Sequence, residues 1–252
     1  MQQNWIMEHD DNGNPIDIGL NSTIFHYMGL EHILCMLDSK SFYVKRKCFY
    51  KDESESRMLP DRLSFAFEIA STNRPVQRTS EEQFAIDERQ RLFAKRSSLL
   101  TSCWSLGPYE NYLLWECYTK TKYGVCIKST IGRVLNSFGI CNYNIWCGKM
   151  IYRKRQQTDT PEDAKWIKPP EYSGEREIRF YFAPKSDMDK VCILSNLGES
   201  KNLAVNMETL IDTIILSPKL SLQEREKITS FLHDGYGIEE KKIKKSTISL
   251  KF

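Results

Sequence analysis

The chain has 252 residues, 27% of them charged and 12% aromatic, and a formal net charge of +3. These values are ordinary for a globular protein built as one large domain, or as one domain with an insertion, and the charge is too small to establish a nucleic-acid partner. No apolar run approaches the ~20 residues that a membrane-spanning helix requires, and the first residues lack the basic-then-apolar pattern of a signal peptide. We therefore expect a cytoplasmic protein without a membrane partner.

Eight cysteines are scattered along the chain, without a Cys-x-x-Cys pair and without a histidine at metal-ligand spacing. Several lie in apolar, strand-like contexts, as Cys126 and Cys192 do. We expect buried thiols in a reducing cytoplasm and no metal site.

The first quarter of the chain begins with a polar stretch. Residues 1–22, with turn-forming residues at 11–15, predict a loosely held arm, and residues 23–252 then form a single domain. Residues 24–28 predict a short strand, and residues 42–44 predict a second one. Between them, apolar residues at helical spacing predict an amphipathic helix, namely Leu30, Ile33, Leu34 and Leu37.

The remainder reads as short strands with a few helices. Capping boxes at Ser80–Gln83 and Ser221–Glu224 predict helices that run towards Arg96 and His233. Another short helix carries Trp115 and Tyr118. Further strands are predicted at 99–106, 123–128, 145–152, 191–194, 203–205 and 211–216 and in the C-terminal tail around Ile243, Ile248 and Leu250. This pattern predicts an α+β fold with mixed, mostly antiparallel sheets and flanking helices.

A Glu-x-Glu sequence follows the Ser173-Gly174 pair. Residues from Glu175 onward predict a strand with Glu175, Glu177 and Arg179 on one face. Carboxylates on alternate residues repel each other unless a cation, or a group that develops positive charge, lies between them. One interpretation is a site that stabilises an oxocarbenium ion, and the other is a polar face on which Arg179 neutralises the glutamates.

Other side chains offer candidate contacts to a ligand. His26 could project from a strand end and donate a hydrogen bond to a ribose hydroxyl, or be a structural histidine, and Tyr27 is either a core residue or a stacking surface. Ser102 and Ser105 offer hydroxyl groups, but a nucleophilic serine needs a histidine base that the sequence does not identify. Phosphate-binding glycine loops, a Gly-x-Ser-x-Gly elbow and a His-Glu-x-x-His motif do not occur.

The order of these pieces resembles a widespread bacterial family of uncharacterised domains. The shared motifs are His-Tyr, Cys-Phe-Ser, Met-Trp-x-x-Tyr with a following Gly, Glu-x-Glu-x-Arg and Ile-Ile-x-Gly-Pro. They correspond here to His26-Tyr27, Cys103-Trp104-Ser105, Leu114 to Tyr118 with Gly124, Glu175 to Arg179, and Ile214 to Pro218. Trp104, Leu114 and Ser217 depart from the pattern, and the Asn-Asp-Pro-Phe-Glu loop is at best degenerate at residues 51–55.

The layout is also similar to that of the ADP-ribosyltransferases, and its His-Tyr motif resembles their DNA-targeting toxins. This resemblance implies NAD as the cofactor, with His26 on its ribose and Ser102 or Ser105 supporting the nicotinamide side. Glu177 would stabilise the oxocarbenium ion and orient the acceptor, and Glu175 would help to deprotonate the acceptor. The other candidate cofactor-binding residues under this resemblance are Tyr27, Trp115, Tyr118 and Arg179.

The resemblance therefore implies a toxin or anti-phage effector that modifies a nucleic acid or, as a second choice, a protein, with an antitoxin or chaperone as a further partner. Local basic clusters favour the nucleic acid, at 45–47, 153–155 and 241–245. One alternative is a non-catalytic nucleic-acid-binding or protein-interaction domain. Another is a metal-dependent nuclease with carboxylates from Asp52, Glu53, Glu175 and Glu177.

Overall fold

The structure is a computed structural model, and it describes residues 5–7, 18–46, 100–139, 141–154, 156, 166–185 and 200–249. The helix predicted after Ser80, the strand predicted at 191–194, Leu250 and the loop with Asp52 and Glu53 lie outside these residues.

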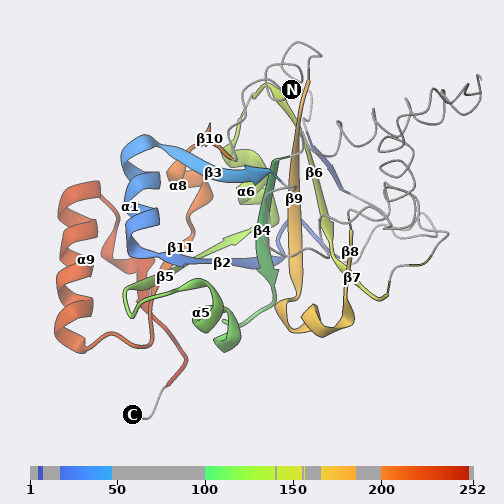
Figure 1. The fold of residues 1–252 in the computed structure, drawn as a ribbon. Helices are drawn as coiled ribbons and strands as arrows, with labels where there is room; N and C mark the ends of the chain where they lie inside the picture. The colour runs from blue at the N-terminus through green and yellow to red at the C-terminus, as the bar shows by residue number, and fades with distance from the viewer. Residues whose placement is uncertain are drawn as a thin grey trace, which may run out of the picture.

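Ten strands of the described residues form one sheet, whose main path has the order β1-β6-β9-β4-β2-β5-β11-β12 (Figure 1). They are β1 (Trp5–Met7), β2 (Thr23–Gly29), β3 (Ser41–Arg46), β4 (Leu100–Leu106), β5 (Gly124–Thr130), β6 (Tyr143–Lys149), β9 (Glu177–Pro184), β10 (Ser200–Ala204), β11 (Thr213–Leu216) and β12 (Ile243–Lys245). A two-stranded sheet joins β7 (Ile151–Tyr152) to β8 (Ile167–Lys168). In the large sheet only β1 with β6 and β11 with β12 pair in parallel, which confirms the expected mixed, mostly antiparallel α+β architecture.

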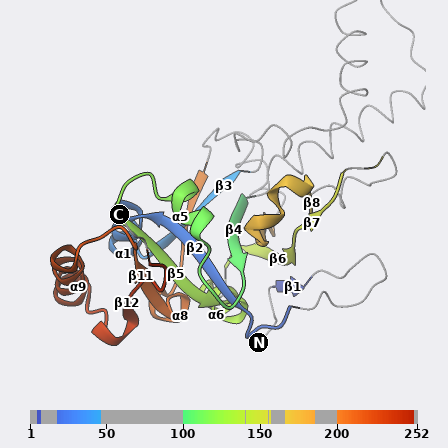
Figure 2. The same ribbon diagram turned by 90° about the horizontal axis from the view of Figure 1, so that it is seen from below.

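The helices lie around this sheet, and α1 and α9 lie next to each other at one end of it (Figures 1 and 2). They are α1 (Leu30–Ser39), α5 (Tyr112–Tyr118), α6 (Ile131–Ser137), α8 (Met207–Leu210), α9 (Leu222–Tyr236) and the 3-10 helices η3 (Pro170–Glu175) and η4 (Glu240–Lys242). The predicted capping box of α9 is confirmed, because the Ser221 hydroxyl accepts from Glu224 N–H and the Glu224 carboxylate accepts from Ser221 N–H. No described helix combines the length and the apolar composition needed to cross a bilayer.

The sheet changes direction between β2 and β4. β2 pairs with β5 over all seven of its residues, but with β4 only at Ile24 and Phe25. Further along the same edge of β4, β3 pairs with Leu100 and Thr101. In the β2–α1–β3 unit, the pairing of β2 with β4 therefore stops after Phe25, and β3 pairs with β4 again near Thr101. Figure 1 shows β2 and β5 crossing the direction of β4, β9 and β6.

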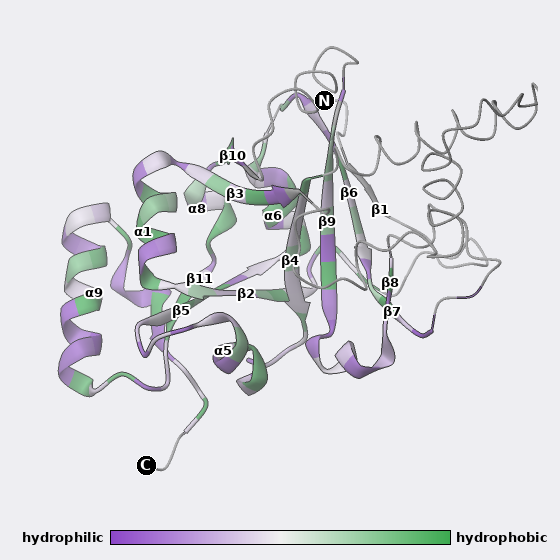
Figure 3. Ribbon diagram, viewed as in Figure 1, coloured by the Kyte–Doolittle hydropathy of each residue, from purple (hydrophilic) through white to green (hydrophobic). Residues whose placement is uncertain are grey.

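Alternation along β9 separates a hydrophobic face from a polar one. Ile178, Phe180 and Phe182 have no exposed surface and enter the main core, to which α1, α6, α8 and α9 also contribute. The hydropathy colours of Figure 3 show this change from residue to residue along β9. The opposite face carries Glu177 and Arg179, which are both buried. Because side chains alternate along the strand, its charged side chains are buried on the face opposite to the main core.

The N-terminal stretch and the cysteines differ in part from what the sequence predicts. Within the stretch expected to be a loose arm, residues 5–7 form β1 and pair with β6, and Ile18 is buried. The thiols of Cys126 and Cys147 are buried as expected, whereas Cys103 in β4 is partly buried and Cys35 and Cys117 are exposed.

Candidate functional site

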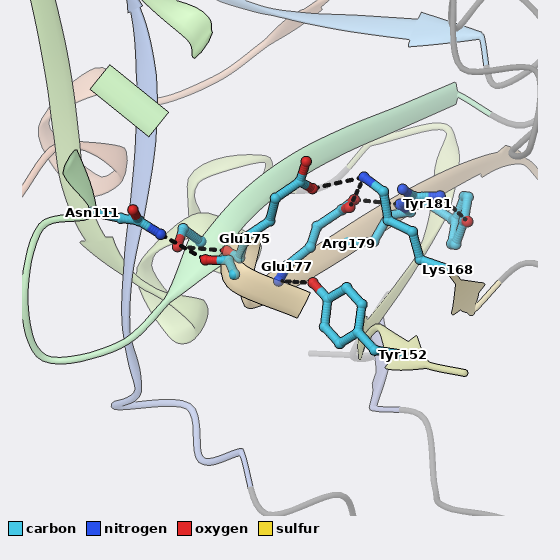
Figure 4. Close-up of polar contacts among 9 residues, drawn as sticks. Asn111, Tyr152, Lys168, Glu175, Glu177, Arg179 and Tyr181 are labelled. Carbon is cyan, nitrogen blue, oxygen red and sulfur yellow. Dashed lines mark hydrogen bonds and ion pairs between the residues drawn. The ribbon is translucent and has the colours of Figure 1, made fainter. Parts of the chain in front are cut away.

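Glu177, the first residue of β9, is the centre of a buried ion-pair network (Figure 4). Arg179 Nε lies 2.5 Å from Glu177 Oε1, and Lys168 Nζ lies 3.2 Å from Glu177 Oε2. Burial opposes ionisation of this carboxyl, but the charge and hydrogen bond of Arg179, the charge of Lys168 and a hydrogen bond with the Cys103 thiol outweigh it and lower the pKa of Glu177 to about 2. Glu177 therefore carries a negative charge inside the protein at neutral pH.

Glu175 does not lie on this strand, which corrects the expectation that the strand begins there. It ends the 3-10 helix η3, and Arg176 has a left-handed backbone with a φ of +46° before β9 starts at Glu177. The turn is held by hydrogen bonds from the Ser105 hydroxyl to the Glu175 carbonyl (2.8 Å) and from the Asn111 amide to the Gly174 carbonyl (2.7 Å).

The two carboxylates nevertheless meet, because Lys168 joins them. Its Nζ lies 2.7 Å from Glu175 Oε2, in addition to the contact with Glu177, and Figure 4 shows the ammonium between the two side chains. Lys168 comes from β8, and the centroid of the Tyr172 ring lies 4.7 Å from its ammonium. Arg179 thus neutralises Glu177 as expected, and Lys168 pairs with both glutamates.

Three members of this site were missed in the sequence. Lys168 belongs to a charged segment whose course depends on the pairing of two-residue strands, a pattern too short to leave a sequence signal. Tyr152 fixes the start of β9 by accepting a hydrogen bond from Glu177 N–H (2.6 Å). Cys103 follows Ser102 in β4, so the two side chains lie on opposite faces of the strand, and the register neighbour of Cys103 on β9 is Arg179. This alternation is the sequence signal that could have identified Cys103.

His26 lies at the point where β2 leaves β4. Its Nδ1 is 2.8 Å from the carbonyl oxygen of Cys103, and its ring contacts those of Phe42 and Trp104, with centroids 5.4 and 5.0 Å away. Burial lowers the pKa of His26 to about 4, the Cys103 hydrogen bond opposing the shift in part, so the ring is neutral at pH 7. A carbonyl only accepts, so Nδ1 carries the proton and Nε2 carries the lone pair. A ribose hydroxyl would therefore donate to His26, the reverse of the expected direction.

The neutral state of His26 makes stability depend on pH. The unfolded chain binds a proton at His26 near pH 6.5 and the folded chain only near pH 4. The contribution of neutral His26 to the stability of the fold is therefore complete above pH 6.5 and is lost as the pH falls to about 4. Between these limits wild type should lose up to about 3 kcal/mol more than His26→Gln, whose amide cannot titrate. Urea unfolding at pH 7.5, 6, 5 and 4 measures the difference. Parallel curves for the two proteins would contradict a neutral imidazole in the folded chain.

The two candidate serines lie on opposite faces of β4. Ser105 is the register neighbour of Glu177, and its hydroxyl serves the η3 turn. The Ser102 hydroxyl instead accepts a hydrogen bond from Trp104 Nε1 (2.9 Å), on the side of the main core. Both serines are 4% exposed, and their hydroxyl contacts are structural. The structure thus brings Ser105, but not Ser102, to the carboxylates.

The aromatic candidates are also divided. Tyr27 and Trp115 pack edge to face with centroids 5.1 Å apart, and Trp115 has no exposed surface, so both are core residues of the layer between α5 and the sheet. Tyr118, at the end of α5, is half exposed. Partial burial of its hydroxyl and the negative charge of Glu175 raise the pKa of Tyr118 well above its usual value, and α5 contacts η3, the helix that ends at Glu175.

Cys103 joins the two parts of the site. Its carbonyl accepts from His26 and its thiol hydrogen-bonds with Glu177. The main chain of Cys103 thus links a neutral imidazole, which packs on Trp104 and Phe42 on the side of the main core, to an ionised buried carboxylate and a lysine-held carboxylate on the opposite face of β4. Within the described ranges, no three His, Cys, Asp or Glu side chains lie close enough to share a metal ion.

Comparisons of the chain with models of protein families, with curated proteins and with solved structures gave no match.

Proposed function

We propose that the protein is an NAD-dependent ADP-ribosyltransferase of the toxin or anti-phage effector type, and that it belongs to the bacterial family that its motifs resemble. The observation that carries the proposal is the strand order β9–β4–β2, which sets Glu177, Ser105 and His26 on three neighbouring strands although they are far apart in sequence. The break in pairing between β2 and β4 lies at His26, so the imidazole stands where the two parts of the sheet separate.

The residues present are suited to a nicotinamide dinucleotide. NAD would bring the bond that breaks, which joins the ribose to a positively charged nicotinamide. The nicotinamide would leave with the bonding electron pair. Glu177, ionised and buried, supplies a fixed negative charge where positive charge develops on the ribose. His26 offers Nε2 as an acceptor for a ribose hydroxyl. Glu175 takes the proton that the acceptor atom loses as it bonds to the ribose carbon, so charge and protons balance.

The acceptor in this proposal is a nucleic acid. Lys241, Lys244 and Lys245 are exposed at the C-terminal end of the described chain, and the rings of Tyr118, on α5, and Tyr172, beside Lys168, are exposed as well. Exposed aromatic rings stack on bases of any sequence, and cations attract the phosphates. This combination favours an unpaired stretch of DNA or RNA over a protein side chain.

A second function is favoured by one specific observation, the pairing of both carboxylates with cations. In a non-catalytic interaction domain, Lys168 and Arg179 would serve only to hold Glu175 and Glu177 and so fix the η3 turn. The domain would then bind nucleic acid or protein through its exposed tyrosines and lysines without changing it.

Labelled NAD distinguishes the two functions. The purified protein is incubated with NAD labelled on the adenylate part and with separate DNA, RNA and protein pools, and Glu177→Gln is run alongside. We expect label in a nucleic-acid pool with wild type and a loss of at least about 100-fold with the variant. If the protein binds nucleic acid but neither labels it nor releases nicotinamide, the interaction domain is favoured. Cleavage of nucleic acid that does not need NAD and that a chelator stops would favour a nuclease.

A further inference from the structure

The Lys168 ammonium lies among groups that suit a cationic ligand. Two carboxylate oxygens lie 2.7 and 3.2 Å away, and the Tyr172 ring lies 4.7 Å away. Carboxylates and an aromatic face are the partners that a protein offers to a bound organic cation. The ammonium itself is buried, with Lys168 only 5% exposed.

We infer that Lys168 occupies the place of the ligand's cationic group, and that it sets how strongly the site prefers a positively charged nicotinamide over a neutral one. This inference rests on the proposed function, since it takes the ligand to be a nicotinamide dinucleotide. Lys168 is then a specificity-determining residue, which must give up its contacts with the carboxylates when the cation enters.

The charges of the network explain why Lys168 has this effect. The Glu177 carboxylate faces the cations of Lys168 and Arg179, and the Glu175 carboxylate faces Lys168. A cationic ring therefore meets cations already paired with the carboxylates, whereas a neutral ring does not compete with them. Removing Lys168 takes one positive charge away from the carboxylates, and a unit charge at contact distance changes a binding constant by at least about tenfold even in a polar protein environment.

The two cations differ in how easily they can move. Arg179 is 1% exposed, lies within β9 and is held between β4 and β6, and its guanidinium also donates to the Tyr181 hydroxyl. Lys168 ends the two-residue strand β8, which pairs with a strand of the same length, and its ammonium sits on a flexible four-carbon stem. Lys168 is therefore the cation that a ligand displaces.

The test compares a cationic ligand with a neutral one of the same shape. Carba-NAD has a methylene in place of the ring oxygen of the nicotinamide-bearing ribose, so the chemistry is blocked, and its reduced form has a neutral nicotinamide ring. Calorimetry gives the dissociation constants of both forms for wild type, Lys168→Met and Lys168→Arg. We expect the preference for the oxidised form to rise at least about tenfold in Lys168→Met and to stay within about twofold in Lys168→Arg, which keeps the charge.

Each outcome decides a separate point. An unchanged preference in Lys168→Met, with binding retained, would overturn the inference and leave the proposed function standing, since Lys168 would then be only an anchor of η3. If wild type binds neither form, the proposed function fails and the inference fails with it. If Lys168→Met does not fold, as judged by near-UV circular dichroism, Lys168→Gln replaces it, because its amide still donates to the carboxylates.

Discussion

In denaturant titrations at pH 7, Glu177→Gln should lower the free energy of unfolding by about 3–5 kcal/mol, the usual effect of removing one partner from a buried ion pair. Glu177 is 4% exposed, and its two oxygens contact Arg179 and Lys168. A glutamine keeps one acceptor oxygen but turns an N–H group towards a cation, which leaves positive charge buried without compensation.

The matched variants are Glu171→Gln and the pair Glu177→Gln with Lys168→Met. Glu171 is exposed on η3, so its change should stay within about 0.5 kcal/mol. The double variant removes one negative and one positive charge together and should be less destabilised than the sum of the single changes. A cost below about 1 kcal/mol for Glu177→Gln, or strict additivity, would contradict a buried network.

The same network predicts a pH dependence. The pKa of Glu177 is about 2 in the folded chain and 4.5 as its ordinary value, so its stabilisation is complete above pH 4.5 and is lost as the pH falls towards 2. This difference corresponds to about 3 kcal/mol, the same order as the cost expected for Glu177→Gln. The gap between wild type and Glu177→Gln should therefore close across this acid range.

Trp115→Ala should lower the free energy of unfolding by about 3–5 kcal/mol, whereas Tyr118→Ala should lower it by less than about 1 kcal/mol. The two residues are three positions apart on α5, but Trp115 has no exposed surface and packs against Tyr27, while Tyr118 is half exposed at the helix end. Removing the indole also leaves Glu110 without the hydrogen bond from Trp115 Nε1 (3.1 Å).

Urea unfolding at pH 7 measures both variants, and nicotinamide-dinucleotide binding by calorimetry is the second readout. We expect Tyr118→Ala to alter ligand binding while the fold is kept, because α5 contacts η3 and the charge of Glu175 acts on Tyr118. A stable Trp115→Ala protein that no longer binds the dinucleotide would contradict the assignment of Trp115 to the core.

Local sequence signals predicted most elements of the described fold. The strand with His26, the helix that follows it and the capped helix α9 depend on neighbouring residues, namely apolar spacing and a Ser-x-x-Glu box, and all three are confirmed. The helix α6 went unnoticed, although Thr130 caps it by accepting a hydrogen bond from Arg133 N–H. Its seven residues are too short for a clear period.

The site was harder to predict, since its decisive contacts are distant in sequence. The Glu-x-Glu spacing suggested two carboxylates on one strand, but the left-handed Arg176 separates them and Lys168 reunites them through a different sheet. Which of Trp115 and Tyr118 is buried depends on the packing of α5 against β2, which spacing alone does not specify. Tertiary contacts decided what local patterns left open.

The rate of nicotinamide release from NAD, compared between Glu177→Gln, Glu171→Gln and wild type, tests the central claim most directly. It is measured with the nucleic-acid pools present, at a temperature where circular dichroism shows that all three proteins are folded. We expect release by wild type and Glu171→Gln at rates within twofold of each other, and a rate at least about 100-fold lower for Glu177→Gln. Equal rates in all three proteins, or no release by wild type with any pool, would contradict Glu177 as the carboxylate of an NAD-dependent transferase.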